Sequence, residues 1–288
     1  MSKKFSIVVP SYNQGGTIGQ TLDSLIAQKQ DVDLEIIVMD GGSTDETCQE
    51  IRMREANISK WVSQPDAGQA DALIKGYSFT TGEILGWLNS DDLLLPGALK
   101  KVSKVFSTQV DIDLVYGDML VIDCENEVIK KQREIDFDSD VLLWVYNYIP
   151  QPSAFWTRRA YDQSGGLDRF KHCAMDYELW VRMLSSGAKF KHIAEYLSCF
   201  RVYASQKNQR YRSISDLEDL EVRDNFLSRH PSKAELRFKY YWHKTRRVTK
   251  RFLAGHYTHG KIDPSLEQWI YDVPKQICFP ETETLKAA

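Results

Sequence analysis

The sequence predicts an α/β protein in which a mostly parallel sheet is covered by helices. Three apolar runs typical of buried strands, residues 5–10, 34–39 and 84–88, are separated by helix-like segments. The first of these segments, residues 18–26, has apolar side chains at the spacing of one helix face. Strands that alternate with helices at this interval indicate βαβ units, whose strands lie parallel in one sheet.

Shorter signals place the remaining elements of the first half. Ser43-Thr-Asp-Glu matches a capping box, so we expect a helix to begin there after the strand that ends at Asp40. Residues 60–63 predict a short strand and residues 67–80 a helix. Pro96 suits the first turn of the helix that follows the third apolar run.

The second half of the chain has a different character. Residues 113–122 predict a strand pair or an edge strand, and residues 200–203 predict a last strand. From about residue 208 onward the sequence is highly charged and helical in pattern. This change of character places a boundary near residue 205.

Composition and charge restrict the classes of function. The chain has 288 residues, of which 42% are hydrophobic and 27% charged, and its net charge is −3. This balance is typical of a globular domain and gives no support for nucleic acid as the main partner. Five scattered cysteines without a C-x-x-C pair indicate reduced thiols rather than a zinc site. With no signal-peptide pattern and no apolar window of about 20 residues, we expect a cytoplasmic protein, free or against a membrane surface.

Polar residues follow three of the predicted strands. Tyr12 and Asn13 follow the first strand, Asp40 the second, and Asp91 and Asp92 the third. The carboxyl ends of parallel strands meet at one edge of a sheet, where open α/β proteins bind their ligands. Adjacent carboxylates there suit a divalent cation with phosphate; the alternative is an ordinary helix N-cap region.

Three further residues have two interpretations each. Asp40 could accept a hydrogen bond from a base or a ribose, or could serve only the strand–turn–helix connection. Asp176, at the start of a short helix, could be a general base or only a cap. Lys75 could touch phosphate, or could be a solvated helix lysine.

Five motifs in order resemble the bacterial family 2 glycosyltransferases, which are inverting enzymes with the GT-A fold. The resemblance covers about residues 5–205, and its motifs occupy residues 6–13, 38–45, 65–72, 86–92 and 175–180. It implies a GT-A domain over residues 1–205, with a nucleotide-sugar half (1–118) and an acceptor half (119–205). Residues 206–288 would then form a C-terminal helical extension.

The resemblance also implies roles for individual residues. Asp40 would read the nucleotide base, Asp92 would bind the metal, Asp91 would face the ribose or sugar, and Asp176 would be the catalytic base. The other positions implied for the nucleotide are Pro10, Tyr12, Asn13, Asp66, Lys75 and Asn89, and those for donor or acceptor are Gln151, Glu178 and Trp180. Many relatives carry a histidine near the last strand where this chain has Tyr203.

The function implied is transfer of a sugar from a nucleotide-sugar, with a UDP-sugar favoured, and with Mn²⁺ or Mg²⁺ as cofactor. The acceptor would be a glycan or a lipid-linked sugar in the synthesis of a surface polysaccharide or O-antigen. The alternatives are a sugar-nucleotide nucleotidyltransferase, which needs a basic loop after the first strand, and a non-catalytic assembly protein. An NAD oxidoreductase is disfavoured because no G-x-G-x-x-G follows the first strand.

One C-terminal segment has an interpretation of its own. Residues 237–251 hold seven Lys or Arg, no acid and interleaved aromatics. This composition indicates a helix that lies on an anionic membrane. The alternative is a solvated helix packed on the catalytic domain through its aromatic side chains.

Overall fold

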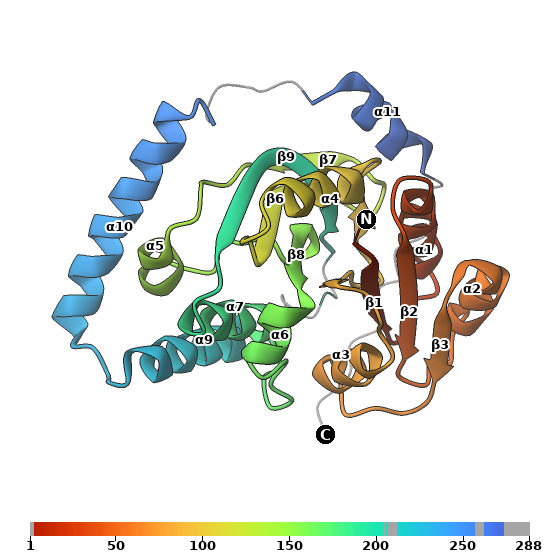
Figure 1. Ribbon diagram of the computed structural model, residues 1–288, viewed down its shortest axis with the longest axis horizontal. Helices are drawn as coiled ribbons and strands as arrows, with labels where there is room; N and C mark the ends of the chain where they lie inside the picture. The colour runs from red at the N-terminus through yellow and green to blue at the C-terminus, as the bar shows by residue number, and fades with distance from the viewer. Residues whose placement is uncertain (1–2, 204–205, 207–211, 257–261, 274–288) are drawn as a thin grey trace, which may run out of the picture.

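The computed structural model describes residues 3–203, 206, 212–256 and 262–273, in which helices cover a central nine-stranded sheet (Figure 1). The strands are β1 (Phe5–Ser11), β2 (Leu34–Asp40), β3 (Lys60–Ser63), β4 (Ile84–Trp87), β5 (Leu93–Leu94), β6 (Leu114–Ile122), β7 (Val128–Gln132), β8 (Ala154–Thr157) and β9 (Phe190–Arg201). The helices are α1 (Ile18–Ile26), α2 (Thr47–Met53), α3 (Gln69–Ser78), α4 (Ala98–Thr108), α5 (Ser139–Trp144), α6 (Arg158–Gln163), α7 (Met175–Ser185), α9 (Arg212–Leu227), α10 (Lys233–Leu253) and α11 (Pro264–Asp272). Short 3₁₀ turns span Ala27–Gln30, Glu55–Asn57 and Gln151–Ser153.

The sheet runs in the order β3-β2-β1-β4-β8-β6-β9-β5, with β7 beside β6. The first four strands in this order are parallel, as predicted, so β1, β2 and β4 end at the same edge. The other half is mixed, because β8 is antiparallel to both β4 and β6 while β6 and β9 are parallel. The prediction of a strand pair or an edge strand over residues 113–122 is wrong, since this segment forms the single strand β6, which lies inside the sheet between β8 and β9.

Side chains that alternate along β1 divide the core between the two faces. Phe5, Ile7 and Val9 pack in the cluster with α1 and α4, whereas Val8 packs in the cluster with α3 and α7. This is the two-residue period of a strand that is covered on both sides. Gly76 lets α3 lie close to the strand, because a Cβ there would come within 2.4 Å of the Val8 side chain.

The C-terminal helices lie around this core (Figure 1). Val222 of α9 belongs to the cluster that includes α7, and Ile270 of α11 packs in a third cluster with β5 and β9 residues. The predicted boundary at residue 205 falls outside the described residues, and the division there stays a prediction. Among the described helices, none combines the length and the apolar character that a membrane span requires.

Candidate active site

A cleft of about 1870 Å³ opens at the edge where β1, β2 and β4 end. Its walls come from the segments after these strands, from the residues before α3 and α7, and from the segment after β9. Eight of the predicted site residues line it: Pro10, Tyr12, Asn13, Asp66, Asn89, Asp91, Gln151 and Asp176. The fold therefore brings distant motifs to one place, as the strand-end argument predicts.

Asp40 lies beneath this cleft and not in its lining. Its carboxylate accepts hydrogen bonds from the backbone N–H groups of Gly42 (3.2 Å) and Ser43 (3.0 Å), and from the hydroxyl of Ser63 (2.6 Å). The Ser43 hydroxyl also donates to Asp40, and its oxygen accepts the backbone N–H of Asn13. Asp40 thus fixes the turn after β2 and, through Ser43, the loop after β1.

This arrangement also corrects the predicted capping box. Ser43 is occupied by Asp40 and Asn13, so it does not cap a helix. The helix begins later, at Thr47, whose backbone N–H donates to the carboxylate of Asp45 over 3.0 Å.

Asp91 and Asp92 differ sharply in what they face. Asp91 lines the cleft, and its Oδ2 accepts a hydrogen bond of 2.8 Å from the Tyr203 hydroxyl. Asp92 is fully buried and is not among the lining residues, and its carboxylate accepts the backbone N–H of Arg201 and the side-chain amide of Asn89. Burial raises the pKa of both carboxyls, and the neighbouring Asp91 charge raises that of Asp92 further.

The carboxylate of Asp91 is the type of ligand that a divalent cation takes. Arg201 lies beside the two acids, but its guanidinium donates to the carbonyls of Asp91 and Asp123 and to Asn126 and Gln20. A carboxylate that faces a cleft without a hydrogen-bonded cation suits a hard ion, which takes oxygen ligands from one or two acids plus phosphate. Among the described residues no group of three or more His, Cys, Asp or Glu could hold a metal ion.

Asp176 lies in the cleft wall that α7 provides. Its Oδ2 accepts a 2.9 Å hydrogen bond from the side-chain amide of Asn147, which also lines the cleft. Burial raises the pKa of Asp176 to about 6. A carboxylate with this pKa, open to a cleft, is able to take up a proton near neutral pH.

A chain of side-chain amides connects the walls of the cleft. Gln69 donates to the Asn89 side-chain oxygen over 2.8 Å, and Asn89 donates to the side-chain oxygen of Gln151 over 3.3 Å. Gln151 in turn donates to the carbonyl of Trp87 over 2.8 Å. This chain fixes Asn89 and Gln151 relative to the end of β4.

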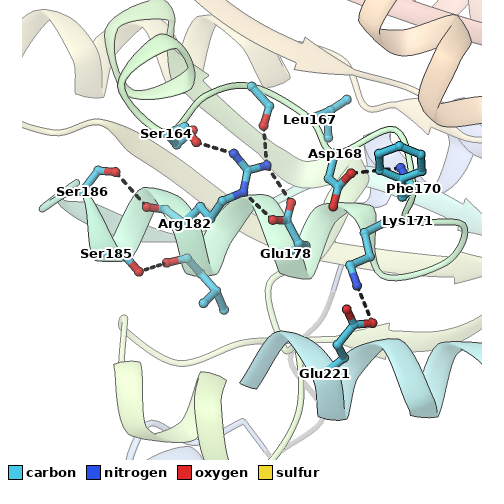
Figure 2. A network of polar contacts seen from close by, with 12 residues as sticks. Ser164, Leu167, Asp168, Phe170, Lys171, Glu178, Arg182, Ser185, Ser186 and Glu221 are labelled. Atoms are coloured by element: carbon cyan, nitrogen blue, oxygen red, sulfur yellow. Dashed lines mark hydrogen bonds and ion pairs between the residues drawn. The ribbon is translucent and has the colours of Figure 1, made fainter. Parts of the chain in front are cut away.

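Glu178 and Trp180, predicted to contact substrate, lie outside the cleft lining. Glu178 pairs with Arg182 one turn along α7, and Arg182 donates to the carbonyls of Ser164 and Gly166 (Figure 2). Trp180 is fully buried and stacks on Trp87 with ring centroids 6.2 Å apart. Both residues therefore support α7 from behind the site.

Lys75 is also absent from the cleft lining. Its ammonium pairs with Asp71 at 2.7 Å, four residues earlier on α3, and its side chain is 38% exposed. The interpretation as a solvated helix lysine fits this placement, and the predicted phosphate contact does not.

The cleft also has lining residues that the sequence analysis does not predict. Asn147 gave no signal because it lies in an irregular segment. The cleft is also lined by three basic residues that precede Asp176 in sequence: Arg169, Lys171 and His172. Three basic residues within four positions are a sequence signal for an anion-binding segment. Gln206 and Ile214 bring the segment after β9 and the start of α9 into the same cleft.

Glu218 of α9 holds the loop that leads to Asp176. It accepts the backbone N–H groups of His172, Cys173 and Ala174, each at 2.8 Å. Although burial opposes the charge, these hydrogen bonds lower the pKa of Glu218 below its ordinary value of 4.5. The loop before α7 is thereby fixed by a helix from the C-terminal part of the chain.

We expect Glu218→Gln to lower the melting temperature at neutral pH. A glutamine oxygen cannot accept all three N–H groups, so the loss amounts to about 2 kcal/mol, or about 4–8 °C. Differential scanning calorimetry measures it, with Glu221→Gln as the matched control, because Glu221 is exposed and pairs only with Lys171 in Figure 2.

The pH dependence of this effect has a definite sign. A carboxyl whose folded pKa is lowered stabilises the fold above its unfolded pKa and loses that contribution as pH falls. The difference between wild type and Glu218→Gln should therefore shrink below pH 4.5. Equal melting temperatures of the two proteins at neutral pH contradict the role assigned to Glu218.

Comparison with known proteins agrees with this geometry. The model of glycosyl transferase family 2 matches residues 6–175, which include all but the first residue of β1, Asp91, and Met175, the first residue of α7. The chain belongs to this glycosyltransferase family. Neither the nucleotidyltransferase nor the non-catalytic alternative is supported by this match.

Two curated relatives show how far the likeness extends. A chondroitin synthase of Pasteurella multocida (strain Pm70) is 30% identical over 202 residues, covering 65% of this chain but 19% of the synthase. A PGL/p-HBAD biosynthesis glycosyltransferase of Mycobacterium bovis (strain BCG / Pasteur 1173P2) is 28% identical over 239 residues, 81% of this chain and 86% of the relative. The glycosyltransferase thus spans about a fifth of the first relative and most of the second.

Solved structures share the fold. TarS 1-349 of S. aureus, in complex with UDP-GlcNAc, aligns with a TM-score of 0.64 at 16% identity, over 93% of this chain and 78% of that chain. A mannosyltransferase of Pyrobaculum calidifontis, in complex with GDP-Man and Mn²⁺, aligns with a TM-score of 0.59 at 18% identity, over 93% and 79%. The predicted GT-A fold of the glycosyltransferase is confirmed.

Proposed function

We propose that this glycosyltransferase transfers a sugar, with inversion, from a nucleotide-sugar to a hydroxyl of a glycan or lipid-linked acceptor. The observation that carries the proposal is that Asp91 and Asp176 line one cleft. The first carboxylate suits the diphosphate side of the donor, and the second, with a pKa of about 6, suits the acceptor hydroxyl. We further propose a product that belongs to a surface polysaccharide or O-antigen.

Asp176 is the proposed general base. It takes the proton of the acceptor hydroxyl while that oxygen bonds to the anomeric carbon, and the bond from this carbon to the diphosphate oxygen breaks. Attack opposite the leaving group inverts the anomeric centre. Asn147 orients the carboxylate through its hydrogen bond. A diphosphate leaves without a general acid, so a second carboxylic acid is not needed, in contrast to glycosidases.

Asp91, rather than the Asp92 predicted from the sequence, is the proposed metal ligand. Asp91 would hold Mn²⁺ or Mg²⁺, and such an ion, when bound, supplies electrostatic stabilisation of the diphosphate leaving group. Asp92 orients this segment through its contacts with Arg201 and Asn89. Tyr203, in the place of a histidine, positions the Asp91 carboxylate.

The proposed base-reading residues are Tyr12 and Asp66, with Asp40 acting through the loops it fixes. Tyr12 lines the cleft with 62% of its surface exposed, so its ring is open to stacking on a base. The Asp66 carboxylate lies over Gly41, where a Cβ would come within 2.9 Å of its oxygen. It can accept the N3–H of uracil, as binding of the UDP-sugar that the family resemblance favours would require.

The test is thermal stabilisation by UDP, GDP and dTDP in the presence of Mn²⁺, followed by release of UDP from candidate UDP-sugars. We expect UDP to stabilise most, and Asp66→Ala to weaken UDP binding by about tenfold or more, the loss of one hydrogen bond to a charged group. Asp33→Ala is the matched control, since Asp33 precedes β2 at the opposite edge of the sheet. Equal stabilisation by the three nucleotides would overturn the assignment to uracil.

A further inference from the structure

Helix α10 has two opposite faces, one packed on the rest of the protein and one exposed. Its inner face packs toward α5, with His243 and Arg247 buried (Figure 1). Arg247 pairs with Glu134 at 2.7 Å and Lys250 pairs with Asp138 at 2.6 Å. Ion pairs and burial therefore attach this face to the catalytic domain.

The outer face of the same helix is apolar and aromatic. At 100° per residue, the side chains opposite His243 and Arg247 include exposed Phe238, Tyr241 and Trp242. They lie with Thr245 and Thr249 along a shallow groove whose described lining comes from α10 alone. Phe252 and Leu253, 71% and 79% exposed, extend this face to the end of the helix. We call these apolar residues the aromatic face.

The charge of the helix narrows the choice of partner. Residues 237–251 hold seven Lys or Arg and no acid, in a chain whose net charge is −3. Arg246, Arg247 and Lys250 pair with acids of the domain. Arg237 and Lys244 are exposed on the flank of the aromatic face. An exposed aromatic face bordered by basic side chains complements an anionic surface that is apolar beneath.

We propose that α10 docks this enzyme on an anionic phospholipid surface, with the aromatic face in the headgroup layer. Phe238, Trp242 and Phe252 insert between the lipids, and Tyr241 and Trp242 keep their polar atoms at the water side. Arg237 and Lys244 reach lipid phosphates along long flexible stems. A helix of 21 residues, roughly 30 Å long, lies flat and does not span.

The inference goes beyond the proposed transfer, because it assigns a place to the enzyme and not a substrate. The aromatic face and the catalytic cleft have no lining residue in common. A change on the outer face should therefore alter lipid binding and leave release of nucleoside diphosphate from the donor unchanged. Failure of one proposal can be told from failure of the other.

Sedimentation with phosphatidylcholine vesicles, with and without phosphatidylglycerol, tests the inference on the full chain. The wild type should sediment with the anionic vesicles. Phe238→Ser with Trp242→Ser should weaken this binding by about 100-fold, given the apolar surface lost. Arg237→Glu with Lys244→Glu should weaken it by roughly 30-fold on anionic vesicles and little on neutral ones. Val110→Ser, an exposed apolar side chain after α4, is the control and should bind like wild type.

Two outcomes overturn the inference. One is that wild type and both double variants sediment equally, whether all bind or none does. The other is that light scattering shows a dimer in lipid-free buffer which Phe238→Ser with Trp242→Ser dissociates, while vesicles bind no protein. That result assigns the aromatic face to a second copy of the chain. Circular dichroism of each variant should show the helix content of the wild type, as expected if α10 is still folded.

Discussion

Replacing Asp176 by Asn is expected to lower the rate of sugar transfer by a factor of about 10²–10⁴ while nucleotide binding stays intact. The amide has nearly the same shape and can keep the contact with Asn147, but it cannot take up a proton. A rate assay with saturating donor, together with UDP binding, measures both effects. Full activity of the variant would show that another group is the base.

The rate of sugar transfer by the wild type should depend on pH as expected for a general base. Because burial raises the pKa of Asp176 to about 6, the rate should rise with pH through this value and level off above it. The residual activity of Asp176→Asn should lack this rise. Asp219 provides the control: burial and the charge of Asp176 raise its pKa to about 7, yet it does not line the cleft. Asp219→Asn should keep most of the activity.

Stability distinguishes a missing base from a misfolded variant. A carboxyl with a raised folded pKa destabilises the fold as pH rises from its ordinary value of 3.8 to about 6, and by a constant amount above that. Asp176→Asn should therefore melt at the same or a higher temperature than wild type at pH 7. Below pH 4 the melting temperatures of Asp176→Asn and wild type should be equal. A large loss of stability at pH 7 would contradict the environment described for Asp176.

The parallel half of the sheet could be predicted because its strands are buried on both faces. β1 and β2 are buried along their whole length, so most of their residues are apolar, although each strand also buries a polar residue near its start, Ser6 or Glu35. Only the last residues of β9 were predicted as a strand, because exposed positions such as Glu195 interrupt the apolar pattern of its 12 residues. The interior position of β6 depends on which strands join later in the chain, which no local pattern contains.

The location of the site could be predicted from the sequence, but the roles of its individual residues could be predicted less well. Strand ends brought eight expected residues to one cleft, but the direction of each carboxylate depends on distant contacts. Asp40 turns toward Ser63, 23 residues away, and Asp91 toward Tyr203, 112 residues away. Which member of Asp91 and Asp92 faces the cleft is decided by such contacts, and adjacency in sequence cannot decide it.

Asp91→Asn is expected to abolish metal-dependent activity and to weaken Mn²⁺ binding in the presence of UDP by about 100-fold or more. Loss of a group that only hydrogen-bonds to a metal ligand lowers metal affinity by up to about 100-fold. Because Asp91 is the proposed ligand itself, its loss should lower the affinity at least as much. Electron paramagnetic resonance of free Mn²⁺, titrated with protein and UDP, measures the affinity. The asparagine retains an oxygen toward Tyr203 but loses the charge that a hard cation requires.

Asp92→Asn is the matched control, since it removes the same charge one residue later. Asp92 is fully buried and does not line the cleft. Although an asparagine keeps only one acceptor oxygen for the N–H groups of Arg201 and Asn89, the variant should retain Mn²⁺ binding to within a few-fold. Burial raises the pKa of Asp92, which means that its charge is unfavourable where it lies. The neutral asparagine should therefore remove an unfavourable buried charge and not a metal ligand. The opposite result, with Mn²⁺ lost in Asp92→Asn and kept in Asp91→Asn, would restore the assignment made from the sequence motif. It would also require the segment after β4 to turn Asp92 into the cleft when the donor binds.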